Sequence, residues 1–167
     1  MISDQTLEVQ IGKLLRQKDR KLVLAESCTG GLLSHMITDV PGSSDYFLGS
    51  LVTYSYEAKS AWLGVKHDTL KTYGAVSRET ALEMAQGARE SMVKVFPKEK
   101  IIALAITGVA GPGGGTPEKP VGLVWIGLSA AEREDAWSFQ WKGKREENKL
   151  NSAQAGLQIL LDYLNSL

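Results

Sequence analysis

An unbroken apolar run from Ile101 to Ile106 (IIALAI) constrains the fold of this chain more than any other segment. A strand with one solvated face alternates polar and apolar residues, and this run has no polar position. Strands without such alternation are typically covered by helices on both faces. The run therefore predicts a central strand in a sheet between helices, and residues 21–25 (KLVLA) predict a second buried strand.

Three more strands follow from local patterns. Residues 47–53 form an apolar stretch behind the turn-forming segment 41–45 (PGSSD). Residues 122–128 and 136–141 predict two antiparallel neighbours that are joined by a charged turn at 132–135. The sheet is therefore expected to contain about five strands.

Helices are predicted where apolar residues recur at helical spacing. Ile11, Leu14 and Leu15 indicate a first helix, with Ser3 or Asp4 as its cap. A later helix is capped by Ser77 and is expected to run as far as Phe96, because Pro97 ends it. The other predicted helices cover residues 32–37, 56–63 and 150–164.

Strands that alternate with helices, together with one hairpin, predict a three-layer α/β/α sandwich with a mixed, mostly parallel sheet. The 167 residues contain no visible linker, so we expect a single domain over residues 1–167. Ligands of such sheets bind beyond the carboxyl ends of the parallel strands. Two loops occupy that position, AESCTGG at 25–31 and TGVAGPGGGTPEKP at 107–120.

Charge and composition narrow the class of partner. Lys plus Arg and Asp plus Glu number 19 each, so the chain lacks the positive field that drives binding to nucleic acid or to a membrane surface. A small-molecule partner is favoured. One cysteine, Cys28, and two scattered histidines, His35 and His67, predict neither a disulfide framework nor a metal cluster. Without an apolar leader at the N-terminus, we expect a cytoplasmic protein.

Ser27 is the central candidate for chemistry. It lies between the end of a strand and the start of a helix, where backbone N–H groups and the helix dipole stabilise an oxyanion or a phosphate. Gly30, and Gly31 after it, would let a ligand approach closely. The alternative is that Ser27 or Thr29 only caps the helix. Cys28 is interpreted as a small core residue, because it has no recognisable histidine partner.

Lys59 is the candidate base for Ser27, since His35 is expected inside a helix and His67 in a polar turn with Asp68. Its helical neighbours Tyr56, Trp62 and Leu63 are apolar, which predicts that Lys59 points with the core-facing stripe. An apolar environment lowers the pKa of a lysine, and the neutral amine can then accept a serine proton. The alternative is a lysine whose ammonium group reaches water.

The glycine-rich loop at 107–120 is neither a Walker loop nor a dinucleotide fingerprint. It is either a long surface connection or a phosphate-binding backbone nest, and its length favours a functional role. Arg145, ahead of the closing helix, is either a phosphate clamp or a solvated arginine.

Taken together, AESCTGG, residues 41–65 (PGSSDYFLGSLVTYSYEAKSAWLGV), residues 73–89 (YGAVSRETALEMAQGAR) and the glycine-rich loop closely resemble the C-terminal domain of the CinA family. The resemblance extends in one register from about residue 5 to the C-terminus. It implies a three-layer α/β/α fold and the activity of the stand-alone family form, nicotinamide mononucleotide amidohydrolase. The other common domain of the family, a molybdopterin-binding-like N-terminal unit, is not expected here.

By the same resemblance, Ser27 and Lys59 form the catalytic pair. Substrate-lining positions are implied at Tyr54, Ser44 and Thr107, and backbone donors at the loop glycines. Thr29 and Gly30 complete the expected substrate site, together with Gly108, Gly111, Gly113 and Arg145. Two departures from the family pattern are Ser50, where a second glycine is usual after Gly49, and Lys149, where an arginine is usual.

The leading hypothesis is therefore hydrolysis of nicotinamide mononucleotide to nicotinate mononucleotide and ammonia, with no metal or other cofactor. One rival is a catalytically silent nucleotide-binding paralogue, suggested by Ser50 and Lys149. Another is a protein that acts only through a partner chain, at a surface around Trp137 and Trp141. A homo-oligomer is expected, with a dimer favoured.

Overall fold

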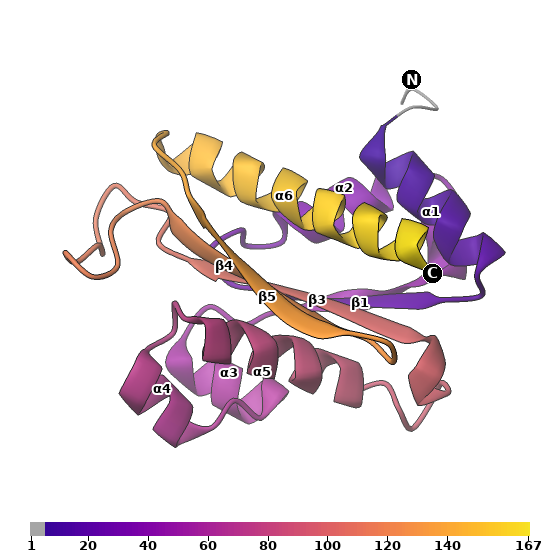
Figure 1. The fold of residues 1–167 in the computed structure, drawn as a ribbon, viewed down its shortest axis with the longest axis horizontal. Helices are drawn as coiled ribbons and strands as arrows, with labels where there is room; N and C mark the ends of the chain where they lie inside the picture. Colours follow the sequence, from indigo (N-terminus) through magenta and orange to yellow (C-terminus); the bar gives the residue numbers. More distant parts are fainter. Residues whose placement is uncertain (1–5) are drawn as a thin grey trace.

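The computed structural model describes residues 6–167, which form one five-stranded mixed sheet covered by helices on both faces (Figure 1). The strand order is β2-β1-β3-β4-β5. The strands are β1 (Lys21–Glu26), β2 (Phe47–Val52), β3 (Ile101–Gly108), β4 (Leu123–Ser129) and β5 (Glu134–Gln140). The helices are α1 (Leu7–Gln17), α2 (Leu32–Thr38), α3 (Tyr56–Leu63), α4 (His67–Tyr73), α5 (Arg78–Glu90) and α6 (Arg145–Ser166), with 3-10 turns η1 (Ser43–Asp45) and η2 (Lys98–Lys100).

Strand direction agrees with the predicted mixed sheet. β1 pairs in parallel with β2 and with β3, whereas β4 pairs antiparallel with both β3 and β5. Four strands therefore run in one direction and β4 runs against them. β3 is the central strand, and its residues 101–107 are all buried, which confirms the prediction from its apolar run.

Two cores explain why β3 has no polar position. Ile102, Leu104 and Ile106 face the core beneath α1, α2 and α6. Ile101, Ala103 and Ala105 face the second core, beneath α5. Figure 1 shows the two helical layers on opposite faces of the sheet, so the predicted three-layer sandwich is confirmed.

Helix α3, which carries the candidate base, is held close to α5 by a glycine. A Cβ atom built on Gly87 would lie 1.8 Å from the carbonyl oxygen of Leu63. No side chain fits at that distance, because backbone atoms cannot give way as a flexible side chain does. Gly87 therefore permits the approach of α3 that fixes the depth of Lys59.

The helix predicted to reach Phe96 ends at Glu90 instead, which corrects that prediction. Arg89 in its last turn is buried and donates hydrogen bonds to the carbonyls of Lys98, Ile101 and Ala130. Because Arg89 binds the segment that leads into β3, the chain turns back soon after the helix ends. Beyond residue 90 the apolar residues still recur at helical spacing, although the chain there is no longer part of the helix.

Two other predictions need correction. His67 begins helix α4, where a polar turn was expected; α4 has only seven residues and buries just Thr69 and Leu70, too few to give a helical pattern. Glu134 and Asp135 belong to β5 rather than to the hairpin turn. The predicted cap at Ser3 or Asp4 lies outside the described residues.

Trp137 and Trp141 are half-buried rather than exposed, because both pack against the core beneath α6. The Trp141 ring stacks on Phe139, and its Nε1 donates to Ser152 Oγ on α6 at 2.9 Å. The surface expected around these tryptophans is therefore largely used for internal packing. Among residues 6–167, no helix has the length and apolarity needed to cross a membrane.

Candidate active site

The site lies at the edge of the sheet where β1 and β3 end. Ser27 follows β1 directly, and its N–H donates to the carbonyl of Ile106 in β3 at 2.9 Å. Beside it, the N–H of Thr53 donates to the carbonyl of Glu26 at 2.8 Å. Ser27 is thus fixed between two parallel strands at their carboxyl ends, as open α/β sheets place their ligand sites.

Lys59 reaches Ser27 from helix α3. Its Nζ lies 2.9 Å from Ser27 Oγ and donates to the carbonyl of Thr53 at 2.8 Å, with the carbonyl of Tyr54 at 3.5 Å. Lys59 is only 1% exposed, and within residues 6–167 it forms no ion pair with a carboxylate. Burial lowers the pKa of Lys59 from 10.5 to about 8, because the charged form loses its hydration.

Lys59 points into the core as predicted, but not all of the apolar neighbours from which this was predicted are buried. Leu63 is buried on the same side of α3, but Tyr56 and Trp62 are 50% and 59% exposed. The apolar stripe assumed around Lys59 is therefore incomplete. Lys59 is buried because α3 packs onto α5 at Gly87 and because backbone carbonyls surround its amine.

The start of helix α2 is capped by Glu26 and not by Ser27 or Thr29. Gly31 is the N-cap residue and has no side chain that could accept a hydrogen bond, and the fully buried Glu26 carboxylate accepts from the N–H groups of this turn instead. It accepts hydrogen bonds at 2.8 to 3.1 Å from Thr29 Oγ1, Gly31 N, Leu33 N, Ser34 N and Ser50 Oγ. The helix start that was expected to hold an oxyanion is therefore occupied by the protein's own carboxylate.

Cys28, directly after Ser27, is an inert neighbour. Its side chain is buried, and burial raises the pKa of the Cys28 thiol to about 11, so the thiol stays neutral at physiological pH. Its backbone N–H has no carbonyl acceptor within residues 6–167. The N–H of the residue after a nucleophilic serine is well placed to stabilise an oxyanion.

A cavity of about 290 Å³ opens over Ser27 and Lys59. The structure brings eight of the predicted residues together around it: Ser27, Lys59, Tyr54, Thr107, Gly108, Gly111, Gly113 and Arg145. Three predicted residues lie elsewhere. Thr29 is buried against Glu26, and Gly30 is exposed near Lys149 Nζ, 3.7 Å from where its Cβ would be. Ser44 is exposed in η1, before the first residue of β2 and so at the opposite end of the sheet.

Arg145 is the one cationic side chain, besides Lys59, among the described residues that line this cavity. As the first residue of α6, it donates from Nη1 to the carbonyl of Gly111 at 2.6 Å and from Nη2 to Tyr54 Oη at 2.9 Å. The guanidinium thus joins the glycine-rich loop to the segment before α3. A free planar edge of such a group suits a phosphate.

The opposite wall includes residues that sequence reasoning missed. Ala75, between α4 and α5, accepts a hydrogen bond from Thr107 Oγ1 at 2.7 Å and donates its N–H to Tyr56 Oη at 3.2 Å. Val76 lies beside it in the cavity wall. Ala75 and Val76 are small apolar residues between two helices, and nothing in their side chains indicates a binding site. Only Tyr56, on the same helix as Lys59, could have indicated this wall from the sequence.

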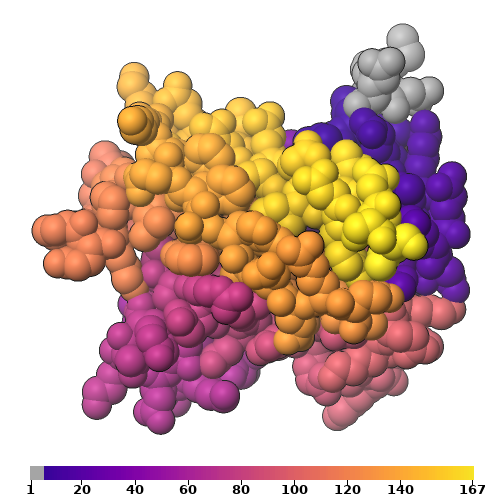
Figure 2. Space-filling view, viewed as in Figure 1, coloured from indigo at the N-terminus to yellow at the C-terminus, as the bar shows by residue number. Residues whose placement is uncertain are grey.

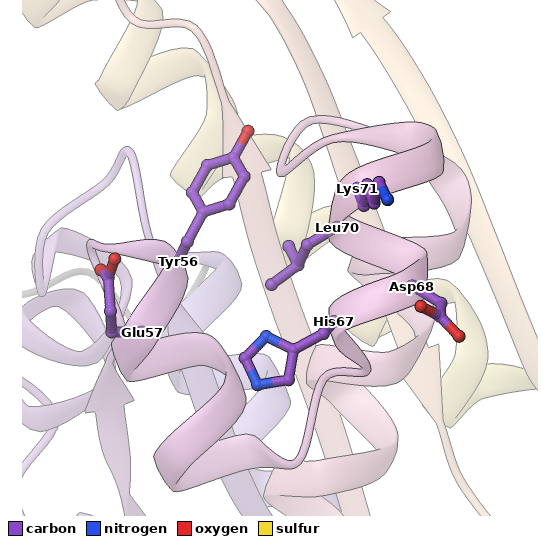
Figure 3. A pocket seen from close by; sticks show the side chains of 6 residues that line it. All are labelled: Tyr56, Glu57, His67, Asp68, Leu70 and Lys71. Carbon is purple, nitrogen blue, oxygen red and sulfur yellow. The ribbon is translucent and has the colours of Figure 1, made fainter.

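The glycine-rich loop projects from the body of the molecule, at the left of the space-filling view (Figure 2). Its Lys119 Nζ donates to the carbonyl of Tyr73, so this hydrogen bond joins the loop to the end of α4. A neighbouring cavity of about 390 Å³ lies between α3 and α4 (Figure 3). Tyr56 lines both cavities, and His67 and Leu70 face the second one.

Comparison with known proteins identifies relatives over nearly the whole chain. The family model described as CinA C-terminal domain matches residues 4–164. A putative competence-damage inducible protein of Moorella thermoacetica is 47% identical over 94% of this chain, and a CinA-like protein of Desulforapulum autotrophicum is 56% identical over 74%. The chain spans 36% and 28% of the lengths of these two relatives, little more than a third at most.

Solved structures agree with the fold. The competence-damaged protein (CinA) superfamily protein of Klebsiella pneumoniae superposes with a TM-score of 0.89 at 28% identity, over 96% of this chain and 97% of that one. The competence/damage inducible protein of Agrobacterium tumefaciens gives a TM-score of 0.77 at 38% identity, over 93% and 96%. None of these names states a reaction.

Proposed function

Because the chain belongs to the family of the CinA C-terminal domain, we propose that it hydrolyses the carboxamide of nicotinamide mononucleotide, giving nicotinate mononucleotide and ammonia. The observation that carries the proposal is the 2.9 Å distance from Lys59 Nζ to Ser27 Oγ in a buried site. A serine needs a base to become a nucleophile, and a buried lysine with a lowered pKa is such a base. The choice of substrate rests on the resemblance of AESCTGG and the glycine-rich loop to the amidohydrolase form of the family.

In the first half of the reaction, neutral Lys59 accepts the hydroxyl proton of Ser27 while Oγ attacks the carboxamide carbon. The resulting tetrahedral intermediate carries the negative charge on the former carbonyl oxygen. Lys59 then returns the proton to the leaving nitrogen, the C–N bond breaks and ammonia departs. Ser27 is left as an ester of the nicotinate carboxyl group.

In the second half, a water molecule attacks this ester and gives a proton to Lys59. The C–O bond to Ser27 breaks, and Lys59 protonates the departing Oγ, so the enzyme is restored. The product is a carboxylic acid that ionises at neutral pH. Every proton and bond is accounted for by Ser27, Lys59 and water.

The oxyanion is stabilised by backbone N–H groups, because helix α2 is already capped by Glu26. The N–H of Cys28 is adjacent to the nucleophile and has no carbonyl acceptor within residues 6–167. Such a donor contributes a large part of the rate in acyl transfer. The substrate phosphate is expected to bind Arg145, because among the described residues that line the cavity it is the one cationic side chain besides Lys59, which contacts Ser27.

The test is ammonia release from nicotinamide mononucleotide by purified protein, with nicotinate mononucleotide identified by chromatography. Ser27→Ala and Lys59→Ala are expected to lose activity while they still fold. Ser44→Ala is the matched control, because Ser44 lies at the opposite end of the sheet and its loss should change nothing. Ammonia release by Ser27→Ala equal to that of the wild type would refute the mechanism.

The second candidate is a catalytically silent protein that binds the nucleotide. The substitution of Lys149 for the usual arginine favours it, since Lys149 Nζ is near Gly30 and follows Arg145 by one helical turn. A lysine lacks the planar fork that grips a phosphate through two bonds. Saturable binding of the mononucleotide without ammonia release would support this alternative over hydrolysis.

A further inference from the structure

We infer that Glu26 is the positioning residue for the nucleophile, acting as an internal anion that fixes the Ser27 turn. The inference rests on the proposed function only for the role of Ser27 as nucleophile. Side chains alternate along β1: Leu22 and Leu24 face the core beneath α2 and α6, and Val23 and Ala25 face the core beneath α5. Glu26 continues the first series toward α2, and Ser27 continues the second toward Lys59 on α3.

Glu26 ties together the segments on either side of Ser27. Its backbone carbonyl accepts from Thr53 N, at the end of β2. Its carboxylate holds the turn after Ser27 through Thr29 Oγ1 and Gly31 N, and the start of α2 through Leu33 N and Ser34 N. The Ser27 backbone therefore lies between two anchored points, and this fixes the direction in which its Oγ faces Lys59.

The negative charge itself is needed. All five groups that bind the carboxylate are neutral donors, and within residues 6–167 no lysine or arginine pairs with it. A carboxylate accepts at both oxygens, whereas an amide of the same shape presents an NH₂ donor in place of one oxygen. In Glu26→Gln, the NH₂ group replaces one of the two oxygens. In place of Oε1 it would face the Ser34 N–H, and in place of Oε2 it would face the three donors that bind that oxygen.

Ser50 strengthens this arrangement in this chain. Its Oγ donates to Glu26 Oε1 at 3.1 Å, which links β2 to the carboxylate. The resemblance to the family implies a glycine at this position, and a glycine has no side chain to make the bond. A hydroxyl can also accept, so in Glu26→Gln the amide NH₂ can donate to the Ser50 hydroxyl in place of Oε1, or to the Thr29 hydroxyl in place of Oε2, where it also meets the N–H groups of the turn. Glu26→Gln and Ser50→Ala should therefore be more harmful together than the sum of their separate effects.

The experiment measures nucleophile positioning directly, as the rate at which an aryl sulfonyl fluoride labels Ser27. Glu26→Gln is expected to slow labelling about 10²-fold, because small misplacements of reacting groups cost that much. Ser50→Ala is expected to slow it about fivefold, the effect of one lost hydrogen bond. Glu90→Gln, an exposed glutamate on α5, is the matched control.

The pH dependence of labelling separates positioning from general loss of structure. If Glu26 positions Ser27, the rate in Glu26→Gln falls but its midpoint stays near the wild-type value, since Lys59 remains buried on α3. If the site merely collapses, Lys59 becomes solvated and the midpoint moves up toward that of an ordinary lysine. A midpoint shifted in that way would overturn the inference.

An unchanged labelling rate in folded Glu26→Gln would also overturn it. Should that variant not fold, an unchanged rate in Ser50→Ala does the same. Ammonia release is measured in parallel: a wild-type protein labelled at Ser27 that releases no ammonia refutes the proposed substrate and leaves the role of Glu26 standing. Absence of labelling at wild-type Ser27 refutes the nucleophile and both proposals with it.

Discussion

Replacement of Lys59 by arginine tests the base without removing the positive charge. An arginine side chain reaches a similar distance but stays protonated throughout the accessible pH range, so it cannot accept a proton from Ser27. With a pKa of about 8, roughly one Lys59 in ten is neutral at pH 7. An ordinary lysine would be neutral in only about three molecules in 10⁴. Burial thus increases the fraction of neutral, reactive Lys59 at pH 7 by about 300-fold.

The activity should follow this titration. We expect kcat/KM to rise about tenfold per pH unit from pH 6 and to level off above pH 8, as neutral Lys59 accumulates. Lys59→Arg should lose about 10³-fold in kcat, within the usual contribution of a general base. Ammonia release from pH 6 to 10 is the assay, with Lys13→Arg, an exposed lysine on α1, as the control. Cys28, whose thiol pKa is raised by burial to about 11, stays mostly neutral over this pH range.

Stability should change at higher pH, between the folded-state and unfolded-state pKa values of Lys59. The folded-state pKa of Lys59 lies below its unfolded value of 10.5, so between about pH 8 and 10.5 the unfolded chain binds more protons than the native one. The free energy of unfolding therefore rises with pH in this window for the wild type, relative to Lys59→Met. Urea unfolding at pH 7 and pH 10 measures the difference. Wild-type activity in Lys59→Arg, or an activity midpoint near 10, would refute the reasoning.

Three further predictions concern packing and binding. Gly87→Ala should lower the free energy of unfolding by about 3 kcal/mol, because the added Cβ forces α3 away from α5. Thermal unfolding measures this loss, and Gly113→Ala, where an added Cβ meets nothing within 4 Å, is the control and should not change stability. Arg89→Ala should lower the free energy of unfolding by about 3 kcal/mol in urea, since it leaves buried carbonyls without donors; a loss below about 1 kcal/mol would contradict this. Tyr54→Phe should raise KM several-fold with little change in kcat, because it frees the Arg145 guanidinium from one of its two supports; a fall in kcat alone would assign Tyr54 to the chemistry instead.

The fold was predictable where one physical requirement dominated the sequence. A strand buried on both faces must be apolar throughout, so residues 101–106 gave the central strand and the three-layer architecture. Predictions failed where a single long-range contact overrode local spacing. The spacing of Met92 and Phe96 continued a helix that Arg89 ends, by binding carbonyls that come later in the chain. Periodicity contains no information about such a contact.

The candidate site was predictable in its two reacting groups and in its glycine-rich wall. Residue type and position at a strand end pointed to Ser27, and the resemblance placed Lys59 beside it. Ser44 was carried over with the same motif and lies at the opposite end of the sheet. Because a motif does not distinguish residues at a site from residues that shape the turn before a strand, resemblance alone could not separate Ser44 from Tyr54.

Glu26 could not be recognised from the sequence, because its role depends on which face of the sheet it meets. A charged residue at the end of an apolar strand normally marks the point where the chain reaches solvent. Here the strand alternation turns Glu26 toward α2, whose N–H groups replace the water that a carboxylate needs, and turns the next residue, Ser27, toward Lys59. The same alternation thus separates an anion that must stay charged from a hydroxyl that must lose its proton. If both pointed to one face, the carboxylate would raise the pKa of Lys59 and weaken it as a base at neutral pH.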